Sequence, residues 1–146
     1  INAAAYTHVD KAETDQDAAH ALNAEGPKQL AEICAALDLP LIHISTDYVF
    51  DGTLDRPYRP DDETNPIGAY GHSKLAGELA VRTATKNHII ARTAWVYSPY
   101  GKNFHKTMVT LGEPRDQLSV VDEQIGNPTS AHEIAEGLFH LCHLID

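Results

Sequence analysis

Short apolar runs alternate along this chain with longer segments whose apolar residues follow helical spacing. The runs at 41–44 and 88–92 have the length and composition of strands buried in a parallel sheet. Residues 118–121 predict a further strand, and residues 1–5 have the pattern of the end of a buried strand. The apolar runs therefore predict a sheet of several short strands.

The predicted helices lie between these runs. The first is expected from Thr14 to Leu39, with Thr14 and Asp17 as a capping pair. Gly26-Pro27 should kink or restart this helix, because proline removes a donor and clashes with the preceding turn. The remaining helices are expected at 70–85, from Asn103 through Leu111, and from Ser130 to Ile145, the last opened by Ser130 and Glu133 as a capping box.

Strands that alternate with helices indicate βαβ units, so the predicted fold class is α/β with a mostly parallel sheet. Residues 51–69 are rich in proline and glycine and predict a long connection, a feature that is usually functional or disordered. We expect one α/β core over residues 1–96 and a trailing α/β segment over residues 97–146.

Composition narrows the function classes. A length of 146 residues, with 42% hydrophobic and 22% charged residues, is ordinary for one globular domain. Lys and Arg total 11 against 21 Asp and Glu, and the formal net charge of -10 argues against nucleic acid or an anionic membrane as a partner. No apolar stretch approaches the ~20 residues of a membrane span.

Cysteine usage and the first residues bear on the compartment. Cys34 and Cys142 each lie in an apolar helical pattern, so no disulfide framework is expected. Residues 1–5 have neither the basic region nor the apolar region of a signal peptide. The expected compartment is the cytoplasm.

A tyrosine and a lysine one helical turn apart carry the strongest chemical signal. Tyr70 and Lys74 begin a predicted helix, and their spacing brings the phenol and the ammonium to one helical face. A free tyrosine has a pKa near ~10, which a nearby cation lowers, and this suits proton transfer to a reduced carbonyl. Taken alone, the pattern is weak, and a surface tyrosine beside a solvated lysine explains it more often.

Hydroxyl side chains directly follow the predicted strand at 41–44. Ser45 and Thr46 stand at its carboxyl end, where open α/β sheets bind ligands. A hydroxyl there can donate to a carbonyl oxygen and stabilise the charge that hydride addition creates. The alternative is that Ser45 and Thr46 only cap the next turn. Together with Tyr70 and Lys74, they favour catalysis.

Several motifs in chain order resemble the extended short-chain dehydrogenase/reductases. They are the segments 2–7, 45–52, 70–74, 92–97, 103–108 and 122–129. They cover nearly the whole chain, and within the family they are most similar to the nucleotide-sugar 4-keto reductases. The resemblance implies a Rossmann-like, doubly wound parallel sheet, here partial with its first strands missing, followed by part of a smaller α/β substrate-binding region.

The resemblance also implies a reaction and its residues. It implies hydride transfer from NADH or NADPH to the C4 keto group of a nucleotide-linked sugar. The residues that match the catalytic triad are Thr46, Tyr70 and Lys74, with Tyr70 as the proton donor. The implied cofactor-binding residues are Ala4, Ala5, Tyr6, Tyr70 and Lys74, and the implied sugar-binding residues are Thr46, Asp47 and Trp95.

The chain departs from the family in its glycines. None of the nine glycines forms Gly-x-Gly-x-x-Gly, the turn that holds the pyrophosphate of the cofactor at a helix N-terminus. We therefore expect a fragment that lacks the first half of the nucleotide-binding sheet and is inactive alone. A preference for NADH or NADPH does not follow from these residues, and a homodimer remains open.

Three weaker constellations have simpler explanations. The acidic cluster Asp10, Glu13, Asp15 and Asp17 favours a solvated helix start over a Mg²⁺ site. A polar stripe on the last helix favours a solvent-facing surface over a metal site, and its members are His132, Glu136, His140 and His143. Three arginines are candidates for bidentate hydrogen bonds to a diphosphate, although arginines are common on protein surfaces: Arg56, Arg59 and Arg115.

Two other functions compete with the reductase. A nucleotide-sugar epimerase or dehydratase shares the fold, although residues 46–50 resemble the reductase group more closely. A non-catalytic regulatory subunit, similar to that of methionine adenosyltransferase, would keep the sheet while its triad is idle. The presence of Thr46, Tyr70 and Lys74 together favours an enzyme.

Overall fold

Two hydrogen-bonded strands form the sheet of the first part of the molecule. The computed structural model describes residues 1–145 and divides into two units, Ile1–Arg92 and a second that starts at Thr93. In the sheet, β1 (Leu41–Thr46) lies beside β2 (His88–Thr93). Both strands form where apolar runs predict them.

The first residues add a short parallel contact to this sheet. The Asn2 N–H donates to the Ile42 carbonyl at 2.7 Å, and the Ile44 N–H donates to the Asn2 carbonyl at 3.1 Å, which makes a parallel bridge between Asn2 and His43. The pairing of β3 with β4 in the second unit is also parallel. The predicted α/β class is confirmed.

The predicted first helix is divided into shorter pieces. A short α1 (Val9–Ala12) precedes α2 (Gln16–His20), a π-helical turn η1 (Ala21–Glu25) and α3 (Gly26–Ala36). The restart predicted at Gly26-Pro27 is confirmed, because Pro27 lies in the first turn of α3. The capping pair of Thr14 and Asp17 is wrong: α2 begins at Gln16 without a side-chain cap, and the Thr14 hydroxyl instead donates to the Lys11 carbonyl.

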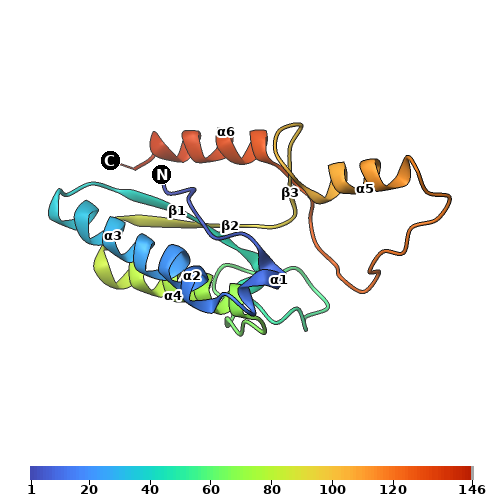
Figure 1. Cartoon of the computed structure of the whole chain (residues 1–146). Helices are drawn as coiled ribbons and strands as arrows, with labels where there is room; N and C mark the ends of the chain where they lie inside the picture. Colours follow the sequence, from blue (N-terminus) through green and yellow to red (C-terminus); the bar gives the residue numbers. More distant parts are fainter. Residues whose placement is uncertain (146) are drawn as a thin grey trace. The chain divides into compact units, whose positions relative to one another are not determined.

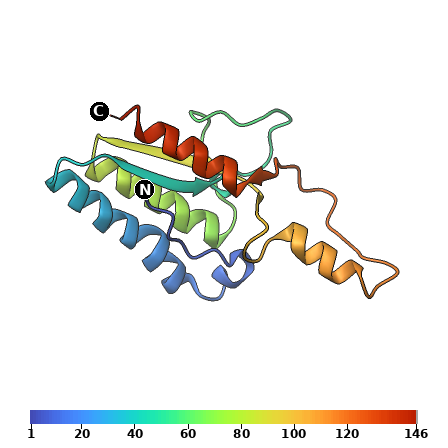
Figure 2. The ribbon, with the colours of Figure 1, turned by 90° about the horizontal axis from the view of Figure 1, so that it is seen from above.

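Helix α4 (Ala69–Ala84) joins the helical layer to the sheet. Figure 1 shows α2, α3 and α4 on one face of β1 and β2, and Figure 2 shows β1 crossing above them. Ala31, Leu41 and Val81 form a buried apolar cluster between these layers. Helix α4 lies very close to η1 at Gly77, where an added Cβ would lie 2.0 Å from the Asn23 carbonyl oxygen.

The second unit contains two short strands and two helices. In chain order these are β3 (Val96–Tyr97), α5 (Phe104–Gly112), β4 (Thr129–Ser130) and α6 (Ala131–Cys142). The predicted Asn103 cap is confirmed, because its Oδ1 accepts from the Lys106 N–H at 3.0 Å. The capping box at Ser130 is wrong: Ser130 precedes α6 but makes no side-chain cap.

The strand predicted at 118–121 does not form. Val120 and Val121 are exposed, and an apolar run becomes a strand only where another strand pairs with it. Among residues 1–145, no helix is long and apolar enough to cross a membrane.

Strand β1 carries a buried histidine, His43. The His43 side chain is fully buried, its Nδ1 lies 3.1 Å from the amide nitrogen of Asn2, and its Nε2 has no hydrogen-bond partner in the described chain. Burial, reinforced by the charge of Lys74 and opposed by that of Glu78, lowers the pKa of His43 from 6.5 to about 4. The folded chain therefore keeps His43 neutral.

The Gly77→Ala substitution should destabilise the first unit. The added Cβ overlaps the Asn23 carbonyl, so α4 must move away from η1, at a cost of about 2 kcal/mol. Urea unfolding followed by circular dichroism measures the loss. The control is Gly26→Ala, whose Cβ would lie an ordinary 3.6 Å from the Ala21 carbonyl oxygen. Equal stability of the two variants would contradict the close approach.

Stability should fall as the pH drops from about 6.5 towards 4. Over that range the unfolded chain binds a proton at His43, whose ordinary pKa is 6.5, whereas the folded chain binds it only near a pKa of about 4. The loss is about 3 kcal/mol when complete. Urea unfolding at stepped pH, compared with His43→Gln, isolates this contribution. A variant with the same slope as the parent between pH 6.5 and 5 would contradict it.

Candidate active site

Lys74 lies at the centre of the site, buried between α4 and β1. Its side chain is 2% exposed, and its Nζ donates to the Ile44 carbonyl at 2.7 Å. Burial lowers the pKa of Lys74 to about 8, although the nearby Glu78 carboxylate acts to raise it. The chain thus holds a cation directly below the carboxyl end of β1.

Thr46 ends β1 and serves two purposes. Its Oγ1 accepts from the Tyr48 N–H at 3.2 Å and donates to Asp47 Oδ1 at 3.1 Å, which caps the short 3-10 turn η2 (Asp47–Val49). The capping role considered for Thr46 is therefore confirmed. The Thr46 side chain also lies close enough to Tyr70 on α4 to lower the pKa of its phenol.

Tyr70 lies half-buried beside the strand end. Its ring meets the Tyr48 ring edge to face, with centroids 5.6 Å apart. Burial raises the pKa of Tyr70, the hydrogen bond with Thr46 lowers it, and the charges of Asp47 and Tyr48 raise it further. The lowering of this pKa expected from the sequence is not found, because burial is the largest cause of the shift and raises the pKa.

Asp47 completes the group at this strand end. Burial raises the pKa of its carboxyl, against hydrogen bonds from Thr46 and from backbone N–H groups that lower it. The structure thus brings together four of the predicted site residues, Thr46, Asp47, Tyr70 and Lys74. The combination is a protonated phenol, a hydroxyl and a buried ammonium at one edge of the sheet.

A buried ion pair lies one helical turn beyond Lys74. The fully buried Glu78 carboxylate accepts from Arg92 Nε at 2.9 Å and from Arg92 Nη2 at 2.7 Å. Burial acts to raise the pKa of Glu78, but hydrogen bonds from Arg92 and Ser45 and the charges of Arg92 and Arg82 hold it below its usual value. This pair was not predicted from the sequence, although Tyr70, Lys74 and Glu78 share one helical spacing.

The predicted cofactor-lining segment is fastened to α4 through Asn23. The Asn23 side chain accepts from the Tyr6 N–H at 2.8 Å, donates to the Tyr6 carbonyl at 3.1 Å and donates to Ser73 Oγ at 2.9 Å. Ser73 in turn donates to the Tyr70 carbonyl. Ala4 is exposed and Ala5 is half-buried beside this network. Asn23 could have been found from the sequence, because it is a polar residue inside an apolar helical pattern.

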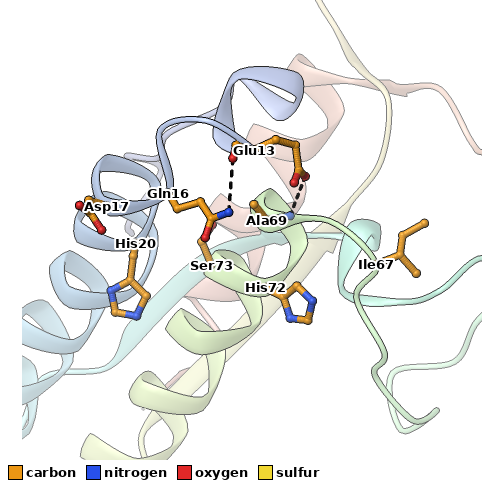
Figure 3. Close-up of a pocket in the computed structure, with 8 residues that line it drawn as sticks. All are labelled: Glu13, Gln16, Asp17, His20, Ile67, Ala69, His72 and Ser73. Atoms are coloured by element: carbon orange, nitrogen blue, oxygen red, sulfur yellow. Dashed lines mark hydrogen bonds between the residues drawn. The ribbon is translucent and has the colours of Figure 1, made fainter.

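A pocket of about 450 Å³ is lined by residues of α2 and of the first turns of α4 (Figure 3). Its lining residues are Glu13, Gln16, Asp17, His20, Ile67, Ala69, His72 and Ser73. The Glu13 carboxylate points to the start of α4 and accepts from the Ala69 N–H at 2.8 Å. A carboxylate favours this position because a helix N-terminus is partly positive. Glu13, placed above in a solvated acidic cluster, therefore caps the helix that carries Tyr70.

Trp95 belongs to the second unit. Its backbone adopts a φ of 47°, its side chain is 41% exposed, and its ring centroid lies 6.2 Å from that of Phe104. It is the one predicted site residue outside the first unit.

The weaker candidates are engaged in local contacts. Arg56 donates to both carboxylate oxygens of Asp62, at 2.7 and 2.8 Å. His132 Nε2 lies 3.2 Å from Glu136 Oε1 on α6. Within residues 1–145, no group of three or more His, Cys, Asp or Glu side chains is arranged to hold a metal ion.

The residues at this edge fit the ribose end of a nicotinamide cofactor. Lys74 has three N–H donors, and the Ile44 carbonyl takes one of them in the described chain, which leaves donors for a ribose hydroxyl. The segment from Ala4 to Tyr6 supplies backbone and a small side-chain surface beside α4. The arrangement can hold a carbonyl compound, donate a proton to it and bind an adjacent ribose.

Comparison with known proteins gives consistent relatives. A dTDP-4-dehydrorhamnose reductase of Sinorhizobium fredii is 53% identical over 135 residues, which cover 92% of this chain and 46% of that protein. A Clostridium acetobutylicum crystal structure of a reductase of that name matches with a TM-score of 0.94 and 44% identity, over 97% of this chain and 50% of that one. The Bacillus anthracis reductase in complex with NADP matches with a TM-score of 0.93 and 42% identity, over the same shares.

The matching region extends along the whole described chain. The chain spans about half the length of the relatives it matches. A family model described as the RmlD substrate binding domain matches residues 1–145. The chain therefore belongs to the RmlD substrate binding domain family.

Proposed function

We propose that this chain carries the catalytic residues of a dTDP-4-dehydrorhamnose reductase. The reaction reduces the C4 keto group of dTDP-4-dehydro-L-rhamnose to give dTDP-L-rhamnose, with NADH or NADPH as the reductant. The observation that carries the proposal is that the buried Lys74, on the same helical face as Tyr70, reaches the Ile44 carbonyl at 2.7 Å, two residues before Thr46 ends β1. The identity of 53% to a protein named for this reaction supports it.

In this mechanism, Tyr70 supplies the proton. A bound reduced nicotinamide supplies the hydride that adds to C4. The Tyr70 hydroxyl donates its proton to the C4 oxygen, so the carbonyl becomes a secondary alcohol and Tyr70 becomes a phenolate. Thr46, at the end of β1 beside Tyr70, is the hydroxyl that donates to the keto oxygen as charge develops on it. The raised pKa of Tyr70 keeps its proton available at neutral pH.

Lys74 has a binding role and an electrostatic role. Its remaining N–H donors bind the ribose hydroxyls beside the nicotinamide, and its charge favours the Tyr70 phenolate that forms after proton transfer. Ala4, Ala5 and Tyr6 line the cofactor on the other side of this group. In the binding of the sugar, Asp47 accepts from hydroxyl groups and Trp95 provides an apolar wall.

In this proposal, the two parts of the chain have different roles. Residues 1–96 supply the second half of a nucleotide-binding domain, and residues 97–146 supply part of the sugar-binding region. Curated relatives that are 53% and 49% identical bear the reductase name, which favours the reductase over the epimerase or dehydratase and over the regulatory subunit. A homodimer is compatible with this proposal.

Replacing Tyr70 by Phe in the full-length protein should lower kcat for dTDP-4-dehydrorhamnose by ~10²–10⁴, the usual worth of a general acid. KM should change little, because the ring remains. Steady-state assay of nicotinamide oxidation measures both constants. The matched control is Tyr100→Phe, which removes the hydroxyl of a highly exposed tyrosine. Near-normal turnover by Tyr70→Phe would refute the mechanism, and turnover absent from the parent as well would favour the regulatory subunit.

Replacing Lys74 by Met should weaken cofactor binding and change the pH profile. Because the pKa of Lys74 is about 8, the protonated form is lost above that pH, and cofactor affinity in the parent should fall on the alkaline side. Lys74→Met should bind weakly at every pH and lack this alkaline limb. Titration of NADPH into the full-length protein from pH 6 to 9.5 tests both, with the exposed Lys86→Met as control. Unchanged affinity and profile would contradict the role.

A further inference from the structure

The backbone of Trp95, the one tryptophan in the sequence, is held within the second unit. Its φ of 47° lies in the left-handed region, which a bulky residue occupies only where its surroundings enforce it. The Trp95 carbonyl accepts from the Thr129 N–H at 3.2 Å, and the next residue begins the parallel pairing of β3 with β4. The segment that leads into β4 is therefore fastened to Trp95.

Gly126, in that segment, lies directly against the indole. A Cβ added to Gly126 would lie 2.6 Å from Trp95 Nε1, 2.8 Å from Cε2 and 3.1 Å from Cδ1. These atoms belong to the five-membered ring, so the Gly126 backbone contacts that ring at a distance that leaves no room for a side chain. Gly137 in the same unit differs, since a Cβ there would meet nothing within 4 Å.

Contacts with Gly126 and Phe104 hold the Trp95 indole in place but leave part of it exposed to solvent. Gly126 contacts the five-membered ring, Phe104 lies 6.2 Å away between centroids, and two-fifths of the Trp95 side chain remains exposed. An exposed indole offers a flat apolar surface and one N–H donor, both suited to a sugar ring. Fixing the ring before the ligand arrives reduces the ordering cost of binding.

We propose that Gly126 is a positioning residue for sugar binding. Its missing side chain lets the Trp95 indole take the orientation in which the deoxysugar packs against it. A residue with a Cβ at this position turns the indole away while leaving Tyr70 and Lys74 untouched. The inference rests on the proposed function, because it takes Trp95 as the wall of the sugar site.

The test is a double-mutant cycle in the full-length protein, assayed with dTDP-4-dehydrorhamnose. Gly126→Ala should raise KM for the sugar nucleotide about tenfold, the effect of overpacking one methyl group. The kcat value and KM for the nicotinamide cofactor should stay within about twofold, as should all constants of the Gly137→Ala control. In a Trp95→Ala background, Gly126→Ala should add nothing, since no ring remains to be displaced.

The outcomes separate this inference from the proposed function. An unchanged KM in Trp95→Ala would remove the sugar wall and overturn both the inference and that part of the proposal, while the Tyr70→Phe result still decides the reaction. If Trp95→Ala raises KM, two outcomes would overturn only the role of Gly126. In one, Gly126→Ala has no effect in the parent. In the other, Gly126→Ala raises KM by the same factor with and without Trp95. If Gly126→Ala fails to fold, the double variant Gly126→Ala/Trp95→Phe provides the test. The smaller phenyl ring leaves room for the methyl group, so the double variant should fold and bind the sugar nucleotide as Trp95→Phe does. A double variant that does not fold would also overturn the inference.

Discussion

The contact of α4 with the carboxyl end of β1 determines the arrangement of the candidate site, and polar groups hold it. Lys74 reaches the Ile44 carbonyl at 2.7 Å, and Glu78, one turn further, is neutralised by Arg92. Burying charges is costly unless they are paired, so these groups favour function over maximal stability. The same contact leaves His43 neutral and buried.

Close approach of the helices extends this constraint to the cofactor segment. Gly77 lets η1 come within contact of α4, and the Asn23 side chain then connects Tyr6 to Ser73. A π-helical turn such as η1 is often found at functional sites, because the extra residue redirects one side chain. The Asn23 amide thus connects the segment expected to line the cofactor to the helix that carries Tyr70, in addition to the apolar packing of Ala69 and Tyr70 against the cluster that contains Tyr6.

The parts of the structure that local pattern determines could be predicted from the sequence. The apolar run at 41–44 and the helical spacing after Tyr70 give β1 and α4, and Thr46, Tyr70 and Lys74 follow from their places on these elements. Long-range contacts could not be predicted this way. Glu13 caps a helix 56 residues later, and Glu78 on α4 pairs with Arg92 on β2. The run at 118–121 fails for the same reason, since pairing is not a local property.

Two opposite pKa shifts divide the chemistry between neighbouring groups. Burial raises the pKa of Tyr70 and lowers that of Lys74, because desolvation disfavours the phenolate in one case and the ammonium in the other. Tyr70 therefore stays protonated over the neutral range, whereas Lys74, with a pKa of about 8, loses its proton first as the pH rises. On the proposed function, we therefore expect the alkaline limit of the reduction to follow deprotonation of Lys74 and not that of Tyr70.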